Sequence, residues 1–475
     1  MSLQPAHKTN PMKKFLLLPA LVFSIIANAQ DAKLKGTVKN PLADSVYVDY
    51  FPDHIIFLPA RVAAGIDEKG NFAMSIPVAD KYMAATLTHG SEQSDLVLGK
   101  GMDLTLTVDG QRFDSSLKFT GKGSEVANFL AAHTLQRGMF LQYSSKGGMA
   151  MMRDKKDVSP ALEGFRKEEE TFMNRYKTLP ADFKKYWMSR YDYTNHYFRA
   201  MYPMAHRQMK QQMGTPPHDS VDLSFPTPPG AFNDDLLGIT EYRMFVSGNF
   251  LQQFYNENDR DGYRRDDSMM RVLHKTLPPK TAEYINAFII YMKRSHYSLP
   301  AMKEMVANYK SMYPNMAYGK QLNASLAMKE KFAAGSPAPD FVLNTQDGKF
   351  VHLSDYKGKV VYIDFWASWC KPCLGEIPHA KTLHEHFANN KDFVVLAISI
   401  DENTAAWKKA IERLQPPGIH GIDNGGWSGT IARAYNIEGV PSYFLIDKDG
   451  NFALDTTPRP SQQAELIAAI EKLLR

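Results

Sequence analysis

The chain is poor in cysteine, with only two among its 475 residues. So few cysteines exclude a disulfide-rich scaffold, in which several bridges take the place of a large hydrophobic core. Both lie in the stretch FWASWCKPCLGEIP, residues 365–378, as Cys370 and Cys373. A bridge across two intervening residues constrains the unfolded chain very little, because disulfide stabilisation grows with loop length. The pair therefore requires a chemical explanation rather than a structural one.

The sequence also lacks a strong charge imbalance. Its formal net charge is +5, and three of its lysines lie in the first 14 residues. No dense run of Lys and Arg follows, so we expect no nucleic-acid partner. Hydrophobic residues make up 44% and charged residues 23% of the chain, which is typical of a soluble globular protein. At roughly 100–200 residues per domain, the length predicts about two to four domains.

The N-terminus has the pattern of a secretory signal peptide, MKKFLLLPALVFSIIANAQ from Met12. Two lysines precede an apolar run that is too short to span a bilayer comfortably, and a small-x-small cleavage sequence then precedes Gln30. A buried N-terminal helix is the alternative interpretation. No cysteine follows the apolar run, which argues against a lipid anchor. We interpret residues 1–29 as a signal peptide with an upstream extension, and expect a periplasmic or envelope protein with no stable membrane anchor after cleavage.

The rest of the chain changes pattern twice. Residues 30–123 contain short apolar runs separated by turn sequences, which predicts an all-β, sandwich-like domain. Residues 124–330 have helical spacing and are expected to form an α-helical domain. Residues 335–475 alternate buried strands such as VVYIDFW and FVVLAISI with helical segments, which predicts an α/β domain. A hairpin is expected around Asp347 and Gly348.

The cysteine pair lies where the last domain would activate a thiol. Cys370 follows a buried strand and opens a helix, so backbone N–H groups and the helix dipole stabilise its thiolate. Lys371 adds positive charge, and Pro372 lies in the first helical turn, where a missing N–H costs little. Cys373 follows one turn later on the same face. A thiolate is the nucleophile in disulfide exchange, so Cys370 is predicted to attack and Cys373 to resolve the mixed disulfide.

Three further positions are candidates for the same site. Asp364 lies in an apolar strand, where a carboxylate is costly, and is expected to relay a proton to and from Cys373; a satisfied structural role is the alternative. Glu376 lies one turn after Cys373 and is expected to tune the thiols, unless it is simply a solvated helix residue. Val440-Pro441 precedes a strand, and a cis bond there would leave the Val440 backbone free to pair with a substrate peptide.

Residues 335–475 resemble the thioredoxin-like TlpA/ResA family of envelope thiol–disulfide oxidoreductases. The matching segments are PAPDF at 337–341, LSDYKGKVVYIDFWASWCKPC at 353–373, EIP at 376–378 and GVPSYFLID at 439–447. Residues 31–122 resemble, more loosely, a β domain of unknown function found ahead of such modules. It matches in KLKGTV, DLTLTVDG and KFTGKG.

The resemblance implies a thioredoxin fold with Cys370 as attacking thiol, Cys373 as resolving thiol and Pro441 as the cis proline. Trp369, Lys371, Pro372, Val440 and Pro441 are then expected to contact substrate. The expected partners are protein disulfide substrates and a membrane thiol carrier that supplies electrons, and we expect no cofactor. Lys371-Pro372 resembles the reducing members of the fold, although the sequence leaves the direction of electron flow open.

Two other functions compete with this interpretation. The first is an envelope adaptor, whose β and helical regions bind a partner and whose appended thioredoxin module is redox-inert or senses redox state. A thiol peroxidase is less favoured, because its reactive cysteine requires a threonine three residues earlier, where this chain has Ala367. His379, His384 and His386 lack the spacing of a three-ligand face, so we expect no metal site.

Overall fold

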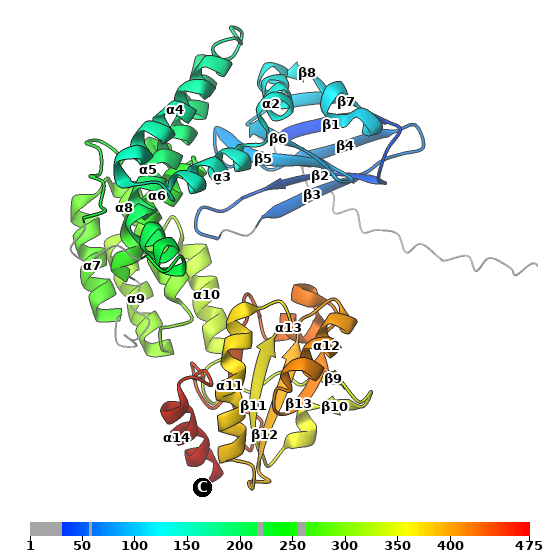
Figure 1. The fold of residues 1–475 in the computed structure, drawn as a ribbon, viewed down its shortest axis with the longest axis vertical. Coiled ribbons are helices and arrows are strands. Elements are labelled where there is room, and N and C mark those ends of the chain that lie inside the picture. Colours follow the sequence, from blue (N-terminus) through cyan, green and yellow to red (C-terminus); the bar gives the residue numbers. More distant parts are fainter. Residues whose placement is uncertain (1–30, 57–58, 216–221, 255–262) are drawn as a thin grey trace, which may run out of the picture. The chain divides into compact units, whose positions relative to one another are not determined.

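The computed structural model describes residues 31–475, apart from 57–58, 216–221 and 255–262 (Figure 1). The predicted signal peptide and its cleavage site lie outside the described residues. The described chain forms two compact units. The first comprises residues 31–52, 59–143 and 172–186, and the second contains the rest of the described chain, including the site-bearing domain.

The first unit is built on two four-stranded sheets, with strand orders β4-β1-β7-β8 and β3-β2-β5-β6. Strand β2 shows why they form: in SVYVDY every second residue is buried, as one apolar face of a sheet requires. Buried side chains from both sheets join one hydrophobic cluster. The elements are β1 Ala32–Lys39, β2 Ser45–Tyr50, β3 Ala60–Gly65, β4 Asn71–Ile76, β5 Tyr82–His89, β6 Glu92–Gly99, β7 Asp103–Asp109, α1 Phe113–Ser116, β8 Lys118–Lys122 and α2 Ser124–Arg137.

The middle of the chain is helical. Helix α9 shows local signals that define such an element: the Ser298 hydroxyl caps its first turn by accepting the Ala301 N–H at 3.3 Å, and a proline occupies the first turn. The helices are α3 Phe140–Ala150, α4 Lys155–Met173, α5 Ala181–Gln212, α6 Thr240–Phe254, α7 Tyr263–Thr276, α8 Pro279–Lys293, α9 Leu299–Met312 and α10 Gly319–Lys331.

The C-terminal part of the second unit contains a six-stranded sheet of order β10-β9-β13-β12-β11-β14. The three central strands are parallel, whereas β14 and β9 run antiparallel to their neighbours. The expected hairpin at Asp347-Gly348 is present as β9 and β10. The elements are β9 Val342–Thr345, β10 Phe350–His352, β11 Val360–Trp366, α11 Lys371–His386, β12 Phe393–Ser399, α12 Thr404–Leu414, β13 Ile419–Ile422, α13 Thr430–Ala434, β14 Ser442–Ile446 and α14 Gln463–Leu474.

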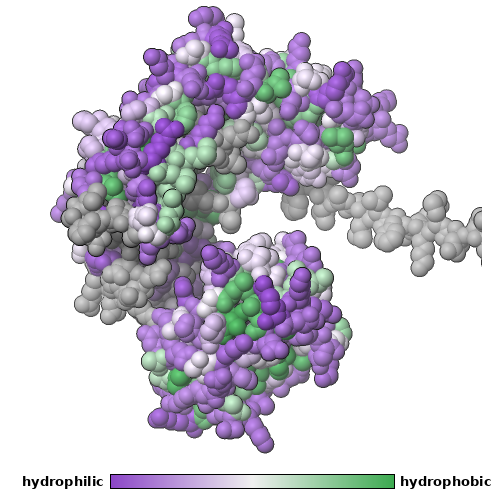
Figure 2. Space-filling model, in the orientation of Figure 1, coloured by the Kyte–Doolittle hydropathy of each residue, from purple (hydrophilic) through white to green (hydrophobic). Residues whose placement is uncertain are grey.

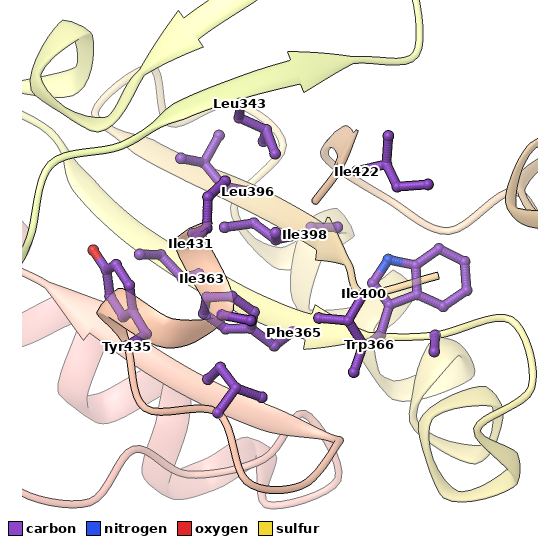
Figure 3. Packing of buried hydrophobic residues seen from close by; sticks show 14 of the residues in the cluster. Leu343, Ile363, Phe365, Trp366, Leu396, Ile398, Ile400, Ile422, Ile431 and Tyr435 are labelled. Carbon is purple, nitrogen blue, oxygen red and sulfur yellow. The ribbon is translucent and has the colours of Figure 1, made fainter. Parts of the chain in front are cut away.

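Helices cover both faces of this sheet. Alternate residues of β11 divide between two hydrophobic clusters, which places Ile363 and Phe365 with residues of α12 and α13, and Tyr362 with residues of α11 and α14. Figure 3 shows Ile363 and Phe365 packed with Leu396 and Ile431 on the first of these faces. The result is a three-layer α/β/α domain. The predicted order of a sheet-rich N-terminal region, a helical middle and an α/β C-terminal domain is confirmed.

The visible exterior is mostly hydrophilic, and apolar side chains reach the surface only in small areas (Figure 2). Among the residues that the structure describes, no helix combines the length and the apolar character that a membrane span needs.

Candidate active site

The cysteine pair lies between the end of β11 and the start of α11. Cys370 is the N-cap of the helix, and its Sγ accepts the backbone N–H of Cys373 at 3.1 Å. The two cysteines form a disulfide with an S–S distance of 2.01 Å. Both residues are about 4% exposed in this oxidised state. The sulfur of Cys370 therefore lies at the positive end of a helix dipole, where a thiolate is stabilised.

The loop before β14 lies against the first of these sulfurs. The Val440–Pro441 peptide bond is cis. The carbonyl oxygen of Val440 is 3.6 Å from the Sγ of Cys370, although the two residues are 70 positions apart in sequence. The structure thus brings together the cysteine and the backbone segment that the sequence predicts for substrate pairing. Their roles in substrate binding stay predictions.

Asp364 lies behind the other cysteine, on β11. The residue is only partly buried as a whole, but its Oδ1 is inaccessible to solvent and has no hydrogen-bond partner among the described residues. Burial, and to a smaller extent the negative charge of Glu376, raises the pKa of Asp364 from its ordinary value of 3.8 to about 7. Asp364 and Cys373 line the same small cavity. A carboxyl group that titrates near neutral pH beside a thiol is suited to proton transfer.

The Glu376 side chain is hydrogen-bonded to a neighbouring loop. Its two carboxylate oxygens accept the N–H and the hydroxyl of Ser461 at 2.8 and 2.9 Å. The side chain still acts on the site through its charge, because it raises the pKa of Asp364. Glu376 thus acts on Asp364 by its charge, and its expected tuning of the thiols stays a prediction.

The predicted substrate-contacting residues around the pair are largely open to solvent. Trp369 is 58% exposed, and its ring centroid lies 6.0 Å from that of Trp427, which is 46% exposed. Lys371 and Pro372 form the exposed first turn of α11. The sequence analysis did not predict Trp427 as a site residue. A short 3-10 helix at Gly426–Ser428 places it beside Trp369, and nothing in the stretch NGGWSG indicates this position.

Asp401 is a second residue that sequence reasoning missed. It is 2% exposed, and its carboxylate accepts the N–H of Ser368 at 2.8 Å, the hydroxyl of Ser368 at 2.7 Å and the hydroxyl of Ser399 at 2.7 Å. These bonds fix the loop that carries Cys370 to the end of β12. The available signal was an acidic residue directly after the apolar run FVVLAISI, at the edge where parallel strands end.

The histidines of α11 do not gather into a site. His386 lies 3.4 Å from Glu471, and no cluster of three metal-ligating side chains occurs within the described ranges.

The geometry defines a class of protein. A three-layer α/β/α domain carries a vicinal cysteine pair at a helix N-terminus, a buried carboxyl group behind it and a cis proline loop in front. Residues 333–463 match the family described as Redoxin. The domain is a thioredoxin-like thiol–disulfide oxidoreductase domain.

Similar proteins show to which family of thiol–disulfide oxidoreductases this domain belongs. The thiol–disulfide oxidoreductase ResA of Bacillus thuringiensis subsp. konkukian is 37% identical over 122 residues, which are 26% of this chain and 68% of the relative. ResA of Bacillus subtilis is 33% identical over 130 residues, 27% of this chain and 69% of the relative. A solved thioredoxin domain of a thiol–disulfide oxidoreductase from Bacteroides vulgatus is 29% identical, with a TM-score of 0.28, and covers 30% of this chain and 99% of that one. Through its C-terminal domain, the chain belongs to the ResA family of thiol–disulfide oxidoreductases.

Proposed function

We propose that the protein is an envelope dithiol–disulfide oxidoreductase that reduces protein disulfides through Cys370 and Cys373. One observation carries this proposal: the sulfur of Cys370 accepts a backbone N–H at the start of α11 and also lies 3.6 Å from the carbonyl oxygen of Val440. The first contact stabilises an attacking thiolate. The second places the sulfur beside a backbone segment able to hold a peptide.

The reaction begins from the reduced pair. The thiolate of Cys370 attacks one sulfur of a substrate disulfide, which forms a mixed disulfide and releases the other substrate sulfur as a thiolate. Cys373 then attacks the sulfur of Cys370, closes the Cys370–Cys373 bridge and releases the second substrate thiolate. The electron pair lost by the two cysteines is gained by the substrate, and solvent protonates the released thiolates.

Asp364 serves the second step. The thiol of Cys373 must lose its proton before it attacks, and the carboxylate of Asp364 is the base that lines the same small cavity. When the bridge is later reduced, Cys373 leaves as a thiolate and the Asp364 carboxyl group returns the proton. A pKa of about 7 allows the same group to act in both directions near neutral pH.

Substrate is held by the surface around the bridge. Val440 and Pro441 lead into β14, which is an edge strand of the sheet. An extended peptide pairs with such backbone groups through main-chain hydrogen bonds, which tolerate many sequences. Trp369, Lys371 and Pro372 flank the same sulfur and add apolar and positive contacts. This surface fits protein disulfides better than one small ligand.

The cellular location of the protein and its electron donor are inferred from the sequence. The signal-like N-terminus supports export to the periplasm or envelope, where disulfides are common. The resemblance to ResA supports electron supply by a membrane thiol carrier. Cell fractionation tests the location, and N-terminal sequencing of the exported protein should begin at Gln30. Recovery of the intact N-terminus in a membrane fraction would contradict this part of the proposal.

Reduction of insulin by dithiothreitol tests the activity. The full chain should accelerate insulin precipitation, and Cys370→Ala should lose the acceleration entirely, because no other residue supplies the attacking sulfur. Phe350→Ala is a matched control, since Phe350 is 69% exposed on β10 and belongs to no proposed step. A wild-type chain no faster than the Cys370→Ala chain would favour the redox-inert adaptor.

A further inference from the structure

A small cavity lies beside Cys373, and its lining also includes Asp364, Trp366, Ala397 and His420. Its volume is about 20 Å³. One water molecule needs roughly 10–15 Å³ of such space together with about two to four polar partners. The cavity therefore has room for one water molecule, and the polar groups of its lining determine whether water binds.

Asp364 and His420 lie in one row of the sheet. Asp364 of β11 pairs with Ala397 of β12, and Ala397 pairs with His420 of β13. Side chains in register on neighbouring strands share a face, and the strands are about 4.8 Å apart, so roughly 10 Å of sheet separates the two residues. The side chain between them is a single methyl group. Ala397 thus leaves open the space that the cavity occupies.

Three residues of the lining each have a buried polar atom that lacks a hydrogen-bond partner among the described residues. These atoms are Oδ1 of Asp364, Nε1 of Trp366 and Nδ1 of His420. The side chains of Trp366 and His420 are almost fully buried, at 4% and 7% exposure. A polar atom that is buried and unpaired is costly, so three of them around one cavity indicate a shared partner.

The tautomer of His420 fits such a partner. Its Nε2 lies 2.9 Å from the carbonyl oxygen of Pro416, which only accepts hydrogen bonds, so Nε2 carries the proton. Burial lowers the pKa of His420, which keeps the ring neutral near pH 7 and leaves Nδ1 as an acceptor. The indole of Trp366 only donates. A water molecule bound here would accept a hydrogen bond from Trp366 and donate to His420 and to Asp364.

We propose that a buried water molecule binds between Asp364, Trp366 and His420, and that His420 is a positioning residue that holds this water as the proton relay between Cys373 and Asp364. The inference rests on the proposed dithiol chemistry and deepens it. In the resolving step Cys373 gives its proton to the water, and the water gives one of its own to the Asp364 carboxylate. The sulfur then attacks Cys370. Re-reduction runs the same transfers backwards, so protons balance and the water is unchanged.

Other ionisable groups also face this carboxyl group. Tyr362 on β11, Glu376 on α11 and Tyr443 on β14 interact with Asp364, and Arg459 acts on Tyr443. The test variants leave these four groups in place. A change in the pH dependence of Cys373 alkylation can then be attributed to the water molecule and the residues that bind it.

The test measures alkylation of Cys373 against pH in the full-length Cys370→Ala chain, which has a single thiol. His420→Leu and Trp366→Phe each remove one partner of the water, and Ala397→Val fills the cavity while Asp364 and His420 remain. Each should raise the midpoint of the pH profile by at least about half a pH unit, because the thiolate and the carboxylate lose a hydrogen-bonding partner. His420→Gln retains an acceptor oxygen and should stay close to the wild-type midpoint. Unchanged midpoints in the folded Ala397→Val and His420→Leu chains would overturn the proposal.

A high-resolution crystal structure of the unsubstituted oxidised protein provides a check that does not depend on the stability of any variant. Water density within hydrogen-bonding distance of all three atoms is expected, and a dry cavity would contradict the inference. Neither measurement requires turnover. Failure of the chain to reduce insulin would therefore count against the proposed function alone, while the alkylation profile and the water density still decide the role of His420.

Discussion

The backbone amide of Cys373 donates a hydrogen bond to the sulfur of Cys370, with 3.1 Å between N and Sγ. Cys370 caps α11, so its sulfur also lies at the positive end of that helix. Cys373 lies one turn further in, against the cavity that it shares with Asp364. The two sulfurs are bonded to each other, yet their electrostatic surroundings differ, and from this difference we expect them to have different chemical roles.

We expect Cys370 to be the more reactive thiol of the reduced protein. Its thiolate is stabilised by the helix start, so iodoacetamide near neutral pH should modify it about ten times faster than Cys373, which corresponds to about one pKa unit. Mass spectrometry of partially alkylated protein measures the ratio. Cys370→Ala and Cys373→Ala chains give the separate rates as controls. Equal rates, or faster labelling of Cys373, would reverse the assignment.

Cys373→Ala should trap substrates, whereas Cys370→Ala should not. Without the resolving thiol, a mixed disulfide on Cys370 has no intramolecular exit. Because the chain has two cysteines in total, every adduct of Cys373→Ala must involve Cys370. Non-reducing gels of envelope extracts should show adducts that vanish with reductant. Adducts on the Cys370→Ala chain would assign the attack to Cys373.

Asp364→Asn should stabilise the protein at alkaline pH. The folded-state pKa of Asp364, about 7, lies above its unfolded value of roughly 3.9, so the folded state binds the proton more tightly and wild-type stability falls as pH rises from about 4 to 7. Asparagine has no charge to bury and avoids this loss. Above pH 7 the gain should be about 2–4 kcal/mol, and it should disappear near pH 4. Thermal unfolding of the oxidised chains at pH 4 and 8 measures it.

The same substitution should slow the resolving step, because the proton acceptor of Cys373 is lost. Stability and rate then change in opposite directions. Asp392→Asn is a matched control, since Asp392 is exposed on the loop before β12. A slower and also less stable Asp364→Asn chain would instead indicate a structural role for the carboxyl group.

Asp401→Asn should destabilise the oxidised protein by about 2–3 kcal/mol. The carboxylate of Asp401 accepts hydrogen bonds on both oxygens, whereas the NH₂ group of asparagine can only donate and would face these same donors. The loop carrying Cys370 should loosen, and insulin reduction should slow. Ser368→Ala removes one of the three hydrogen bonds and should show a smaller loss of the same sign. Thermal unfolding reports the stability. An Asp401→Asn chain that unfolds and turns over like wild type would show that these bonds do not hold the loop.

Trp427→Ala should weaken the handling of protein disulfides while leaving small disulfides unaffected. Exposed tryptophans often dominate protein-binding surfaces, and Trp427 lies against Trp369, the residue that precedes Cys370. The KM for insulin should rise about threefold to tenfold, which corresponds to roughly 1 kcal/mol. The rate with oxidised glutathione should stay constant, and Phe350→Ala should change neither. Equal losses with both substrates would indicate an effect on the sulfurs themselves.

Sequence patterns predicted the parts of the domain that depend on local chemistry. The run VVYIDFW, followed by Cys370 and then a proline in the first turn, is enough to place a strand, a loop and a helix N-terminus. The apolar setting of Asp364 was likewise readable, because a charged residue inside such a run is unusual. These predictions depend on neighbours within about ten residues, where periodicity and capping are informative.

The missed residues depend on register between distant segments. His420 faces Asp364 only because two parallel pairings align β11, β12 and β13, and the residues are 56 positions apart. Asp401 reaches Ser368 across 33 positions. Neither relationship leaves a pattern in the local sequence, since parallel strands are joined by long crossovers. The three histidines of α11 drew attention because they are close together in sequence, whereas His420, which lines the cavity, has no histidine near it in sequence.

A chain with a single pair of cysteines has one possible internal bridge. Four cysteines allow three connectivities and six allow fifteen, and most of these bury the wrong groups together. Here oxidation and correct pairing are the same event, so folding in an oxidising compartment needs no isomerase to sort the thiols. No other residue of this long polypeptide can form a disulfide. Any disulfide-linked dimer or adduct of this chain must therefore involve Cys370 or Cys373.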